Sequence, residues 1–385
     1  MQKLFSVDDH VCEPPDTWSS RVPAKYRDQA PHIVRDGKQE LWEYEGVRNP
    51  TIGLNATAGR PQEEWETEPI SYSEMIPGCY DPAERAKDLA REGIMSTMIF
   101  PTLPRFGGAL FPSFKDKDLA DVCVQAWNDF MFDWCSVSPK MFVPMSLVQL
   151  WDVDLAVKET KRNLDRGVRA ICVPEELSYL GLPSYFSGYW DPLFALCEEA
   201  ELPICMHIGS SGWQAYRPPE SPASLAIAIS FVATQTHAVG MMFGPVCRRF
   251  PNIKIVYSEG GVGWVPAAVE RADRMYQRHR YWDDMVGDED LLPSEICKRN
   301  MWFCMIDEPF GLANRDVIGI DRIFWECDYP HSSCIWPGTQ KIVEDLFDGV
   351  SEADKRKIFY ENAEGIFKWK CPEPEEFPAL MGAPA

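Results

Sequence analysis

Short runs of apolar and β-branched residues alternate with longer segments of helical periodicity along this chain. The apolar runs have the length and composition of buried strands and lie at residues 4–8, 97–101, 142–147, 170–173, 203–207, 254–258, 301–304 and 323–328. Residues 118–135 and 224–249 have the periodicity of amphipathic helices, and Asp81 and Asp191, each followed by proline, are helix-start signals. This alternation predicts an α/β fold with a distorted (β/α)8 barrel. No glycine-rich dinucleotide motif follows the first strand, which disfavours an open doubly wound sheet.

Two regions interrupt the alternation. Residues 14–80 separate the first strand from its helix by far more than a usual loop, so we expect an insertion that covers the C-terminal mouth of the barrel. Residues 174–190, rich in Gly, Pro, Ser and aromatics, predict a long active-site loop. We expect residues 1–371 to form one barrel domain and residues 372–385 to form a C-terminal arm.

Composition narrows the class of protein. The 385 residues are 45% hydrophobic, and the net charge of −21 with no basic run argues against a nucleic-acid partner. No uninterrupted apolar stretch approaches the ~20 residues that cross a bilayer, and the N-terminus lacks the apolar stretch of a secretory signal. We therefore expect no membrane partner and a cytoplasmic location. The 13 cysteines include no C-x-x-C pair, which is typical of reduced thiols, and Cys12 and Cys334 lie within a few residues of candidate metal ligands.

Ionisable residues gather where the predicted strands end, which is where a barrel carries its chemistry. The residues at these positions are Asp8, His10, Glu13, His207, Glu259, Asp328 and His331. Three of the six histidines of the chain are among them. Because alternate residues of a strand face the same side, Asp8 and His10 can both face the barrel axis. Any one of these side chains alone is equally well explained as a hydrogen-bonded group in a polar barrel mouth, but together they predict a metal site.

Four segments resemble a known family: VDDHVCEP, LPICMHIGSSGW, FPNIKIVYSEGGVGW and FWECDYPHS. They are similar to the amidohydrolase-related branch of the amidohydrolase superfamily, which includes the aminocarboxymuconate-semialdehyde decarboxylase group. The resemblance covers the first strand and residues 81–367, and it implies a metal-dependent barrel enzyme. It places Asp8 and His10 at the family's first ligand pair, His207 at its strand-five ligand, and Asp328 at the carboxylate that binds metal and takes a proton from bound water.

One position departs from this pattern. Where the family's decarboxylases carry a catalytic histidine after strand six, this chain has Glu259. A carboxylate is a hard anionic ligand and a poor acid unless its pKa is raised, which makes simple decarboxylation less favoured. The strand-end carboxylates and histidines together exceed what one ion needs, so we expect two ions, with iron or manganese favoured and zinc as the alternative. The Asp-x-His-x-x-Glu opening is similar to a divergent subgroup of non-haem dinuclear iron enzymes with hydrolytic or oxygen-dependent chemistry.

Other candidates have a simpler structural explanation as well. His237 is a candidate ligand, although a core histidine bonded to a backbone carbonyl explains it equally well. Glu13 can instead cap the turn that leaves the first strand. The candidate substrate-binding residues are Arg105, Trp213, Trp264 and Tyr329. Arg105 is suited to a carboxylate or carbonyl group and the aromatics to a dry pocket, but each can instead pack the insertion against the barrel.

We therefore expect a metal-dependent hydrolase that acts on a small acyl substrate such as an amide or thioester. The principal ion would be bound by Asp8, His10, His207 and Asp328, and the second by Glu259, His331 and Glu13. The ion would lower the pKa of a bound water toward ~7, and the catalytic residues would be Asp328, Glu259 and His331.

Three alternatives stay open. The first is a dinuclear iron or manganese oxygenase that receives electrons from a separate reductase. The second is a non-oxidative decarboxylase with one divalent metal. The third is a non-catalytic barrel subunit. In each case we expect a homo- or hetero-oligomer with a related subunit.

Overall fold

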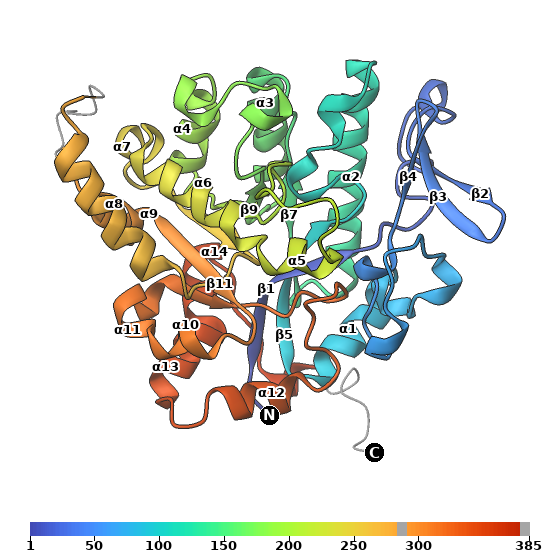
Figure 1. The fold of residues 1–385 in the computed structure, drawn as a ribbon. Helices are drawn as coiled ribbons and strands as arrows, with labels where there is room; N and C mark the ends of the chain where they lie inside the picture. The colour runs from blue at the N-terminus through green and yellow to red at the C-terminus, as the bar shows by residue number, and fades with distance from the viewer. Residues whose placement is uncertain (283–290, 378–385) are drawn as a thin grey trace.

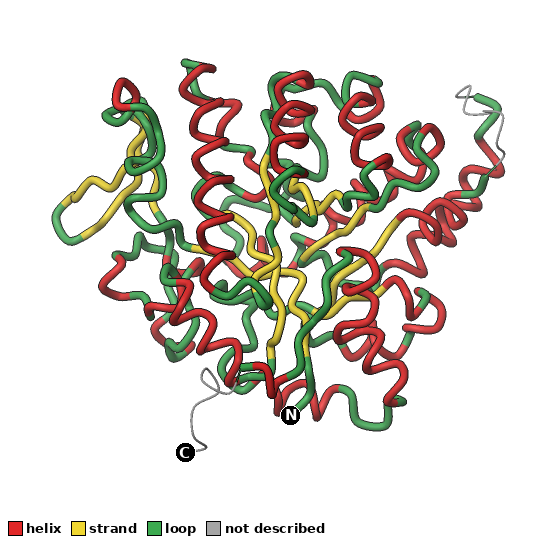
Figure 2. The backbone as a smooth tube through the Cα atoms, turned by 180° about the vertical axis from the view of Figure 1, so that it is seen from behind, coloured by secondary structure: helices red, strands yellow, loops and turns green. Residues whose placement is uncertain are grey.

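The structure is a computed structural model, and it describes residues 1–282 and 291–377. Parallel strands form the wall of a barrel that is surrounded by helices (Figures 1 and 2). The barrel strands are β1 (Leu4–Val11), β5 (Ile94–Pro101), β6 (Phe142–Val143), β7 (Met145–Leu147), β8 (Ala170–Cys172), β9 (Ile204–His207), β10 (Ile255–Ser258), β11 (Met301–Met305) and β12 (Ile323–Trp325). The predicted α/β barrel is confirmed, because neighbouring strands of this series pair with each other in parallel.

The strands pair in sequence order in two sheets, β1-β5-β6 and β7-β8-β9-β10-β11-β12. Pro144 separates β6 from β7, because proline cannot donate the ladder hydrogen bond, so the predicted strand 142–147 is divided in two. The two sheets also meet where β1 lies near β12. There the Asp328 N–H donates to the Asp8 carbonyl at 2.8 Å and the His10 N–H donates to the Tyr329 carbonyl at 2.6 Å. These bonds hold the end of β1 beside the segment that follows β12.

Helices cover the outside of the barrel. They are α1 (Pro82–Arg91), α2 (Lys117–Val137), α3 (Val153–Leu164), α4 (Asp191–Glu199), α5 (Ala223–Ala228), α6 (Phe231–Phe243), α7 (Val246–Arg249), α8 (Val265–His279), α9 (Pro293–Asn300), α10 (Pro309–Ala313), α11 (Arg315–Ile318), α12 (Thr339–Leu346), α13 (Glu352–Arg356) and α14 (Asn362–Phe367). Asp81 caps α1 as predicted, since its carboxylate accepts from the Ala83 and Glu84 N–H groups. The side chain of Asp191 does not cap α4. It pairs with Arg249 instead.

The insertion forms a small antiparallel sheet of its own. Strands β2 (His32–Asp36), β3 (Gln39–Tyr44) and β4 (Val47–Pro50) lie at the side of the barrel, beyond α2 (Figure 1). Trp42 on β3 packs edge-on against Trp18, whose indole N–H donates to the Cys123 carbonyl on α2 at 3.1 Å. These buried indoles fasten the insertion to the barrel. The C-terminal part of the predicted arm, residues 378–385, lies outside the described residues.

The segment predicted as one helix over 224–249 is divided into α5, α6 and α7. By length and hydropathy alone, Ala223–Phe243 could form a membrane-crossing helix. Polar residues such as Ser230 and Thr234 interrupt the apolar run of this stretch, so its sequence contains no uninterrupted apolar segment of membrane-spanning length. In the structure α5 and α6 are separate, and α6 buries Ala233, Thr234 and Ala238 against its neighbours.

Candidate metal centre

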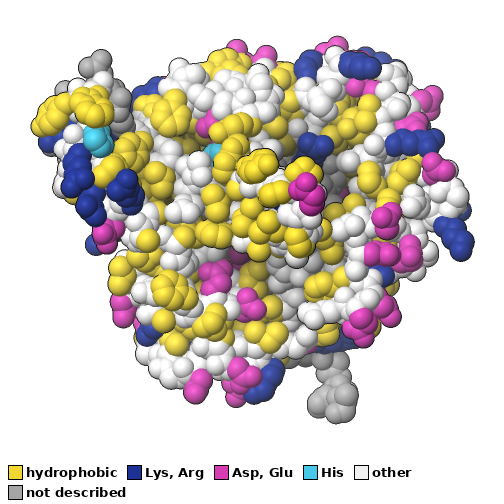
Figure 3. All heavy atoms as spheres, in the orientation of Figure 1, with side chains coloured by type: hydrophobic (Ala, Val, Ile, Leu, Met, Phe, Trp, Pro, Cys, Tyr) yellow, Lys and Arg dark blue, Asp and Glu magenta, His cyan; other side chains and the backbone are white. Residues whose placement is uncertain are grey.

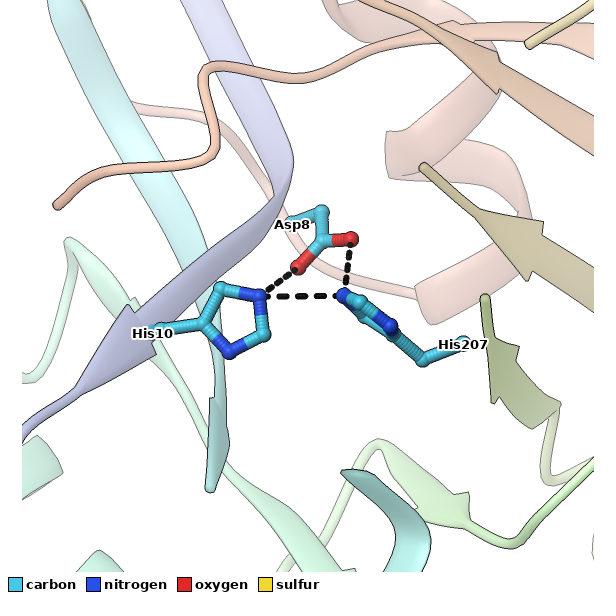
Figure 4. A group of neighbouring side chains, drawn as sticks. All are labelled: Asp8, His10 and His207. Carbon is cyan, nitrogen blue, oxygen red and sulfur yellow. Dashed lines mark hydrogen bonds and ion pairs between the residues drawn. The ribbon is translucent and has the colours of Figure 1, made fainter. Parts of the chain in front are cut away.

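Asp8, His10 and His207 meet at the C-terminal ends of two barrel strands (Figure 4). The two imidazole Nε2 atoms lie 3.0 Å apart. The Asp8 carboxylate faces both nitrogens, with Oδ1 3.4 Å from His10 Nε2 and Oδ2 3.1 Å from His207 Nε2. The three side chains are fully buried. The His207 Nδ1 atom lies 2.8 Å from the Ile208 carbonyl, so the ring proton belongs on Nδ1. The Nε2 atom, which faces Asp8, is then unprotonated and offers its lone pair to a metal ion.

β1 turns Asp8 and His10 inward and Asp9 outward. The Asp9 carboxylate accepts hydrogen bonds from Ser6 Oγ, Thr97 Oγ1 and the Tyr329 N–H. The pairing of β1 with β5 is irregular between Ser6 and Asp9, and the strand runs on to Val11 rather than ending at Asp8 as predicted. The longer strand therefore carries both inward candidate ligands itself.

Asp328 and His331 complete the group from the far side. Asp328 Oδ1 lies 3.3 Å from His10 Nε2 and 3.6 Å from His331 Nδ1. Asp328 has a φ of 61°, a left-handed conformation that is costly for a residue other than glycine and that clusters at functional sites. The His331 ring stacks on the His10 ring, with 3.7 Å between centroids and 13° between planes. His10, Asp328 and His331 also bring ligand atoms close enough together that they could hold an ion.

The chemistry of these side chains fits a divalent cation. Both carboxylate oxygens of Asp8 and both of Asp328 are buried without a hydrogen-bond partner among the described residues. Burial, with the nearby Glu259 carboxylate, raises the pKa of Asp8 and Asp328 well above the usual range. Burial also lowers the pKa of His10 and His207, so neutral imidazoles provide no balancing charge. A cation supplies the partner that buried carboxylates require, and two Asp with two His is a set that manganese, iron or zinc accepts.

Glu259 lies directly after β10, beside this group. Its Oε2 is 3.5 Å from His207 Nε2, and its Oε1 accepts a hydrogen bond from Ser333 Oγ at 3.0 Å. The residue has a φ of 56°, and its N–H donates to both carboxylate oxygens of the buried Glu326. At Gly260, an added Cβ would collide with Thr234 of α6, which explains the glycine. Glu259 is therefore held in an unfavourable backbone conformation so that its carboxylate faces the cluster.

Glu13, predicted to bind a second ion, is not brought to the cluster. Its carboxylate accepts hydrogen bonds from the Thr102 N–H at 3.1 Å, the Leu103 N–H at 2.9 Å and Trp127 Nε1 at 3.0 Å. Three donors use the oxygens that a metal would need. Burial raises its pKa to about 7. The chain turns away from the barrel axis after β1, so Glu13 ties the first strand to the loop after β5 and to α2.

Replacing Glu13 by glutamine should lower the free energy of unfolding by about 1–3 kcal/mol. The glutamine NH₂ group would take the place of a carboxylate oxygen and face an N–H donor, which would then be buried without an acceptor. Chemical denaturation measures this change, with the exposed Glu63→Gln of the insertion as control. The metal content of the purified Glu13→Gln protein should equal that of the wild type. A loss of metal from this variant would show that Glu13 is a metal ligand after all.

Other predicted site residues also lie elsewhere. His237 is on α6, where its Nε2 lies 3.1 Å from Ser211 Oγ, in a separate cavity of about 400 Å³. The Tyr329 side chain is fully buried and donates to Asp88 at 2.9 Å, so it is unavailable to a substrate. Arg105 is exposed. Trp213 lines a third, smaller cavity, and among the predicted substrate residues Trp264 alone lines the cavity at the cluster.

Several neighbours of the cluster are not among the predicted site residues. The Phe106 ring lies 4.0 Å from the His207 ring and 4.9 Å from the His10 ring, measured between centroids. Asn55 of the insertion approaches His331 Nε2 at 3.4 Å, and no sequence signal pointed to it. Glu326 could have been found from the sequence. It lies two residues before Asp328, and because alternate residues of a strand face the same side, both are expected on one side of the predicted strand.

A cavity of about 840 Å³ opens from the cluster to the surface. Its lining comes from the insertion, α5 and α6, the loops after β10 and β11, and the segment after Asp328. Glu259 lines it and contacts His207, so the cavity reaches the cluster. The indole N–H groups of Trp65, Trp264 and Trp336 donate to backbone carbonyls, which leaves apolar ring surface for the cavity. Figure 3 shows this face of the molecule, hollowed below a band of hydrophobic side chains with acidic side chains beside the hollow.

Two curated relatives are decarboxylases. A 2-amino-3-carboxymuconate-6-semialdehyde decarboxylase of Dictyostelium discoideum is 24% identical over 249 residues, which are 57% of this chain. The chain spans 64% of that protein's length. A gamma-resorcylate decarboxylase of Polaromonas sp. is 22% identical over 343 residues, 80% of this chain and 92% of that protein. Decarboxylation is the activity that the sequence analysis placed after hydrolysis and oxygen chemistry.

Solved structures share the fold. An amidohydrolase from Mycobacterium avium subsp. paratuberculosis superposes with a TM-score of 0.73 at 21% identity, over 95% of this chain and 97% of that one. A dihydroxybenzoic acid decarboxylase from Polaromonas sp., with bound manganese and 2-nitroresorcinol, gives a TM-score of 0.59 at 16% identity, over 96% and 97% of the two chains. A family model described as Amidohydrolase matches residues 36–369, which is most of the sequence. The chain therefore belongs to the amidohydrolase family.

Proposed function

We propose that the chain is a metal-dependent, non-oxidative decarboxylase of a small aromatic acid. Asp8, His10, His207 and Asp328 hold one divalent cation. When bound, such a cation acts as a Lewis acid that polarises an oxygen of the substrate. Support comes from the unpartnered carboxylate oxygens of Asp8 and Asp328, from the two curated decarboxylases, and from the manganese in one structural neighbour.

The observation that carries the reaction is the position of Glu259. It is the described residue that both lines the cavity and contacts the cluster. In decarboxylation the bond to the carboxyl carbon breaks, its electron pair stays on the ring carbon, and a proton must take up that pair. Glu259 is placed to deliver this proton, and Ser333 Oγ and the Glu326 carboxylate hold it in position. His331 stacks on His10 with its Nδ1 3.6 Å from Asp328 Oδ1, and it is a second group that could exchange a proton with Asp328.

Hydrolysis is the second candidate, and Glu259 is also the observation that favours it. Removing a proton from water needs a base, and the Glu259 carboxylate beside the cluster could also serve in that role. An amide or thioester of a small acid is the corresponding substrate. The oxygenase and its reductase, the second ion and the oligomer stay predictions.

The cavity also defines the charge of the substrate. None of the described lining residues is Lys, Arg or His, whereas Glu259, Asp307 and Glu308 bring carboxylates. The stretches 283–290 and 378–385 contain no basic residue either. One anionic group can be balanced by a cation at the cluster, but a second would be buried beside carboxylates without a partner, which is costly. We infer that the substrate carries at most one anionic group and presents apolar ring surface to Trp65, Trp264 and Trp336.

Paired probes test the charge of the substrate. The manganese-loaded protein should bind 2-hydroxybenzoate at least about tenfold more tightly than 4-hydroxyisophthalate, which adds one carboxylate. Quenching of tryptophan fluorescence measures both affinities. Asp307→Asn should narrow the difference because it removes a carboxylate from the lining. Equal affinities in the wild-type protein would contradict the inference.

Product analysis tests the reaction. The manganese-loaded protein is incubated in deuterium oxide with hydroxylated benzoates and, separately, with thioesters and amides of the same acids. We expect carbon dioxide and a product with one deuterium on the ring carbon that carried the carboxylate. Release of the free acid from the thioester or amide, without carbon dioxide from the benzoates, would replace decarboxylation by hydrolysis.

A further inference from the structure

Two cysteines bracket the loop that carries Asp328 and His331. The Sγ atoms of Cys327 and Cys334 lie 3.8 Å apart. Cys327 is the second residue after β12 and directly precedes Asp328, and Cys334 comes three residues after His331. All 13 cysteines of the chain are free thiols, so this pair is reduced in the structure.

The pair has access from the cavity. Cys334 is partly exposed and lines the large cavity, whereas Cys327 is fully buried behind it. The Trp336 N–H approaches Cys334 Sγ at 3.2 Å and holds this sulfur in place. A small oxidant that enters the cavity therefore meets Cys334 first, and Cys327 is the neighbouring thiol that can react next.

We propose that Cys327 and Cys334 form a reversible disulfide that disturbs the metal centre. In the first step Cys334 sulfur attacks a peroxide, the O–O bond breaks, and the products are a sulfenic acid and water. In the second step Cys327 sulfur attacks the sulfenic sulfur, the S–O bond breaks, and a second water leaves. The pair loses two electrons and two protons, and the peroxide is reduced. A dithiol returns both electrons and restores the two thiols.

The geometry connects this bond to the cluster. A disulfide holds its sulfurs about 2.05 Å apart, so the two sulfur atoms must approach each other from 3.8 Å, which puts tension on the loop between them. Asp328 has a left-handed backbone conformation that its surroundings impose, and its N–H is bonded to the Asp8 carbonyl. His331 is held by Thr57, whose hydroxyl donates to the His331 carbonyl at 2.8 Å. Because Cys327 is joined directly to Asp328, a bond that pulls Cys327 toward Cys334 strains the loop at Asp328, and we expect this side chain to shift relative to His10.

The test uses the full-length protein loaded with manganese, and its first readout is a mass. Cys327 and Cys334 lie in one tryptic peptide, residues 323–341, and cleavage before Asp328 separates them. After mild treatment with hydrogen peroxide, we expect this peptide to be two hydrogens lighter and its two fragments to stay joined after that second cleavage. Dithiothreitol should reverse both changes. This readout does not depend on any catalytic activity. The disulfide can therefore fail to form while the proposed function stands, and it can form even if the proposed function is wrong.

The second readout is metal content. We expect peroxide to lower the manganese affinity of the wild-type protein at least about tenfold, as loss of a supporting contact does, and dithiothreitol to restore it. Cys334→Ser and Cys327→Ser should each bind manganese under reducing conditions and lose the sensitivity to peroxide. Cys135→Ser, in α2, should keep it. Oxidation of Cys334 alone to a sulfinic acid, a disulfide that instead joins Cys12 to Cys79, or a Cys327 to Cys334 disulfide without loss of metal would each overturn the proposal.

Discussion

Replacing His207 by alanine should remove the metal and, with it, all measurable turnover. His207 offers Nε2 to the cluster 3.0 Å from His10 Nε2 and 3.1 Å from Asp8 Oδ2, so its loss takes away one of the four proposed ligands. Changes to the outer partners of metal ligands already cost about 10–100-fold in affinity, and we expect loss of a direct ligand to cost more. Elemental analysis after dialysis measures the effect.

A control separates ligand loss from misfolding. His32→Ala changes a histidine of the insertion whose ring Nδ1 lies 2.8 Å from the Ala30 carbonyl, and it should leave the metal content unchanged. Circular dichroism should give the wild-type spectrum for both variants. Metal bound to His207→Ala at the wild-type level would show that the cluster is not the metal site.

Replacing Glu259 by glutamine should leave the barrel folded and the principal ion bound, but lower turnover by about 10²–10⁴-fold. Glutamine keeps the shape of the side chain and the hydrogen bond from Ser333, but it cannot deliver or accept a proton at neutral pH. Single-turnover kinetics with the manganese-loaded variant measure the effect. The exposed Glu344→Gln on α12 is the control and should have wild-type rates.

The metal content of Glu259→Gln also tests the second ion. If Glu259 and His331 bind a second ion, the wild-type protein should hold two ions per chain and the variant one. If both proteins hold one ion, Glu259 acts on the substrate alone. A variant with wild-type turnover would remove Glu259 from the chemistry altogether.

The barrel could be predicted because its strands are buried on both faces and therefore appear as uninterrupted apolar runs between amphipathic helices. Strand alternation also predicted that Asp8 and His10 face the same side, and the structure brings both to His207. The division at Pro144 and the breaks within 224–249 were missed because local patterns set the type of an element better than its limits.

The sequence does not show in which direction the chain and its side chains point after a strand ends. Glu13 follows β1 by two residues, yet the chain has turned and the carboxylate faces two backbone N–H groups and an indole. Tyr329 follows Asp328 directly, but its side chain points away toward Asp88. Asn55 reaches His331 from an insertion whose path depends on the packing of Trp18 and Trp42. Only tertiary packing decides these three positions.

Anomalous scattering from crystals of the manganese-loaded protein, collected at the manganese edge, tests the central claim most directly. We expect a peak among Asp8, His10, His207 and Asp328, within coordination distance of all four side chains. The absence of a peak there, or a peak elsewhere with these four residues uninvolved, would contradict it.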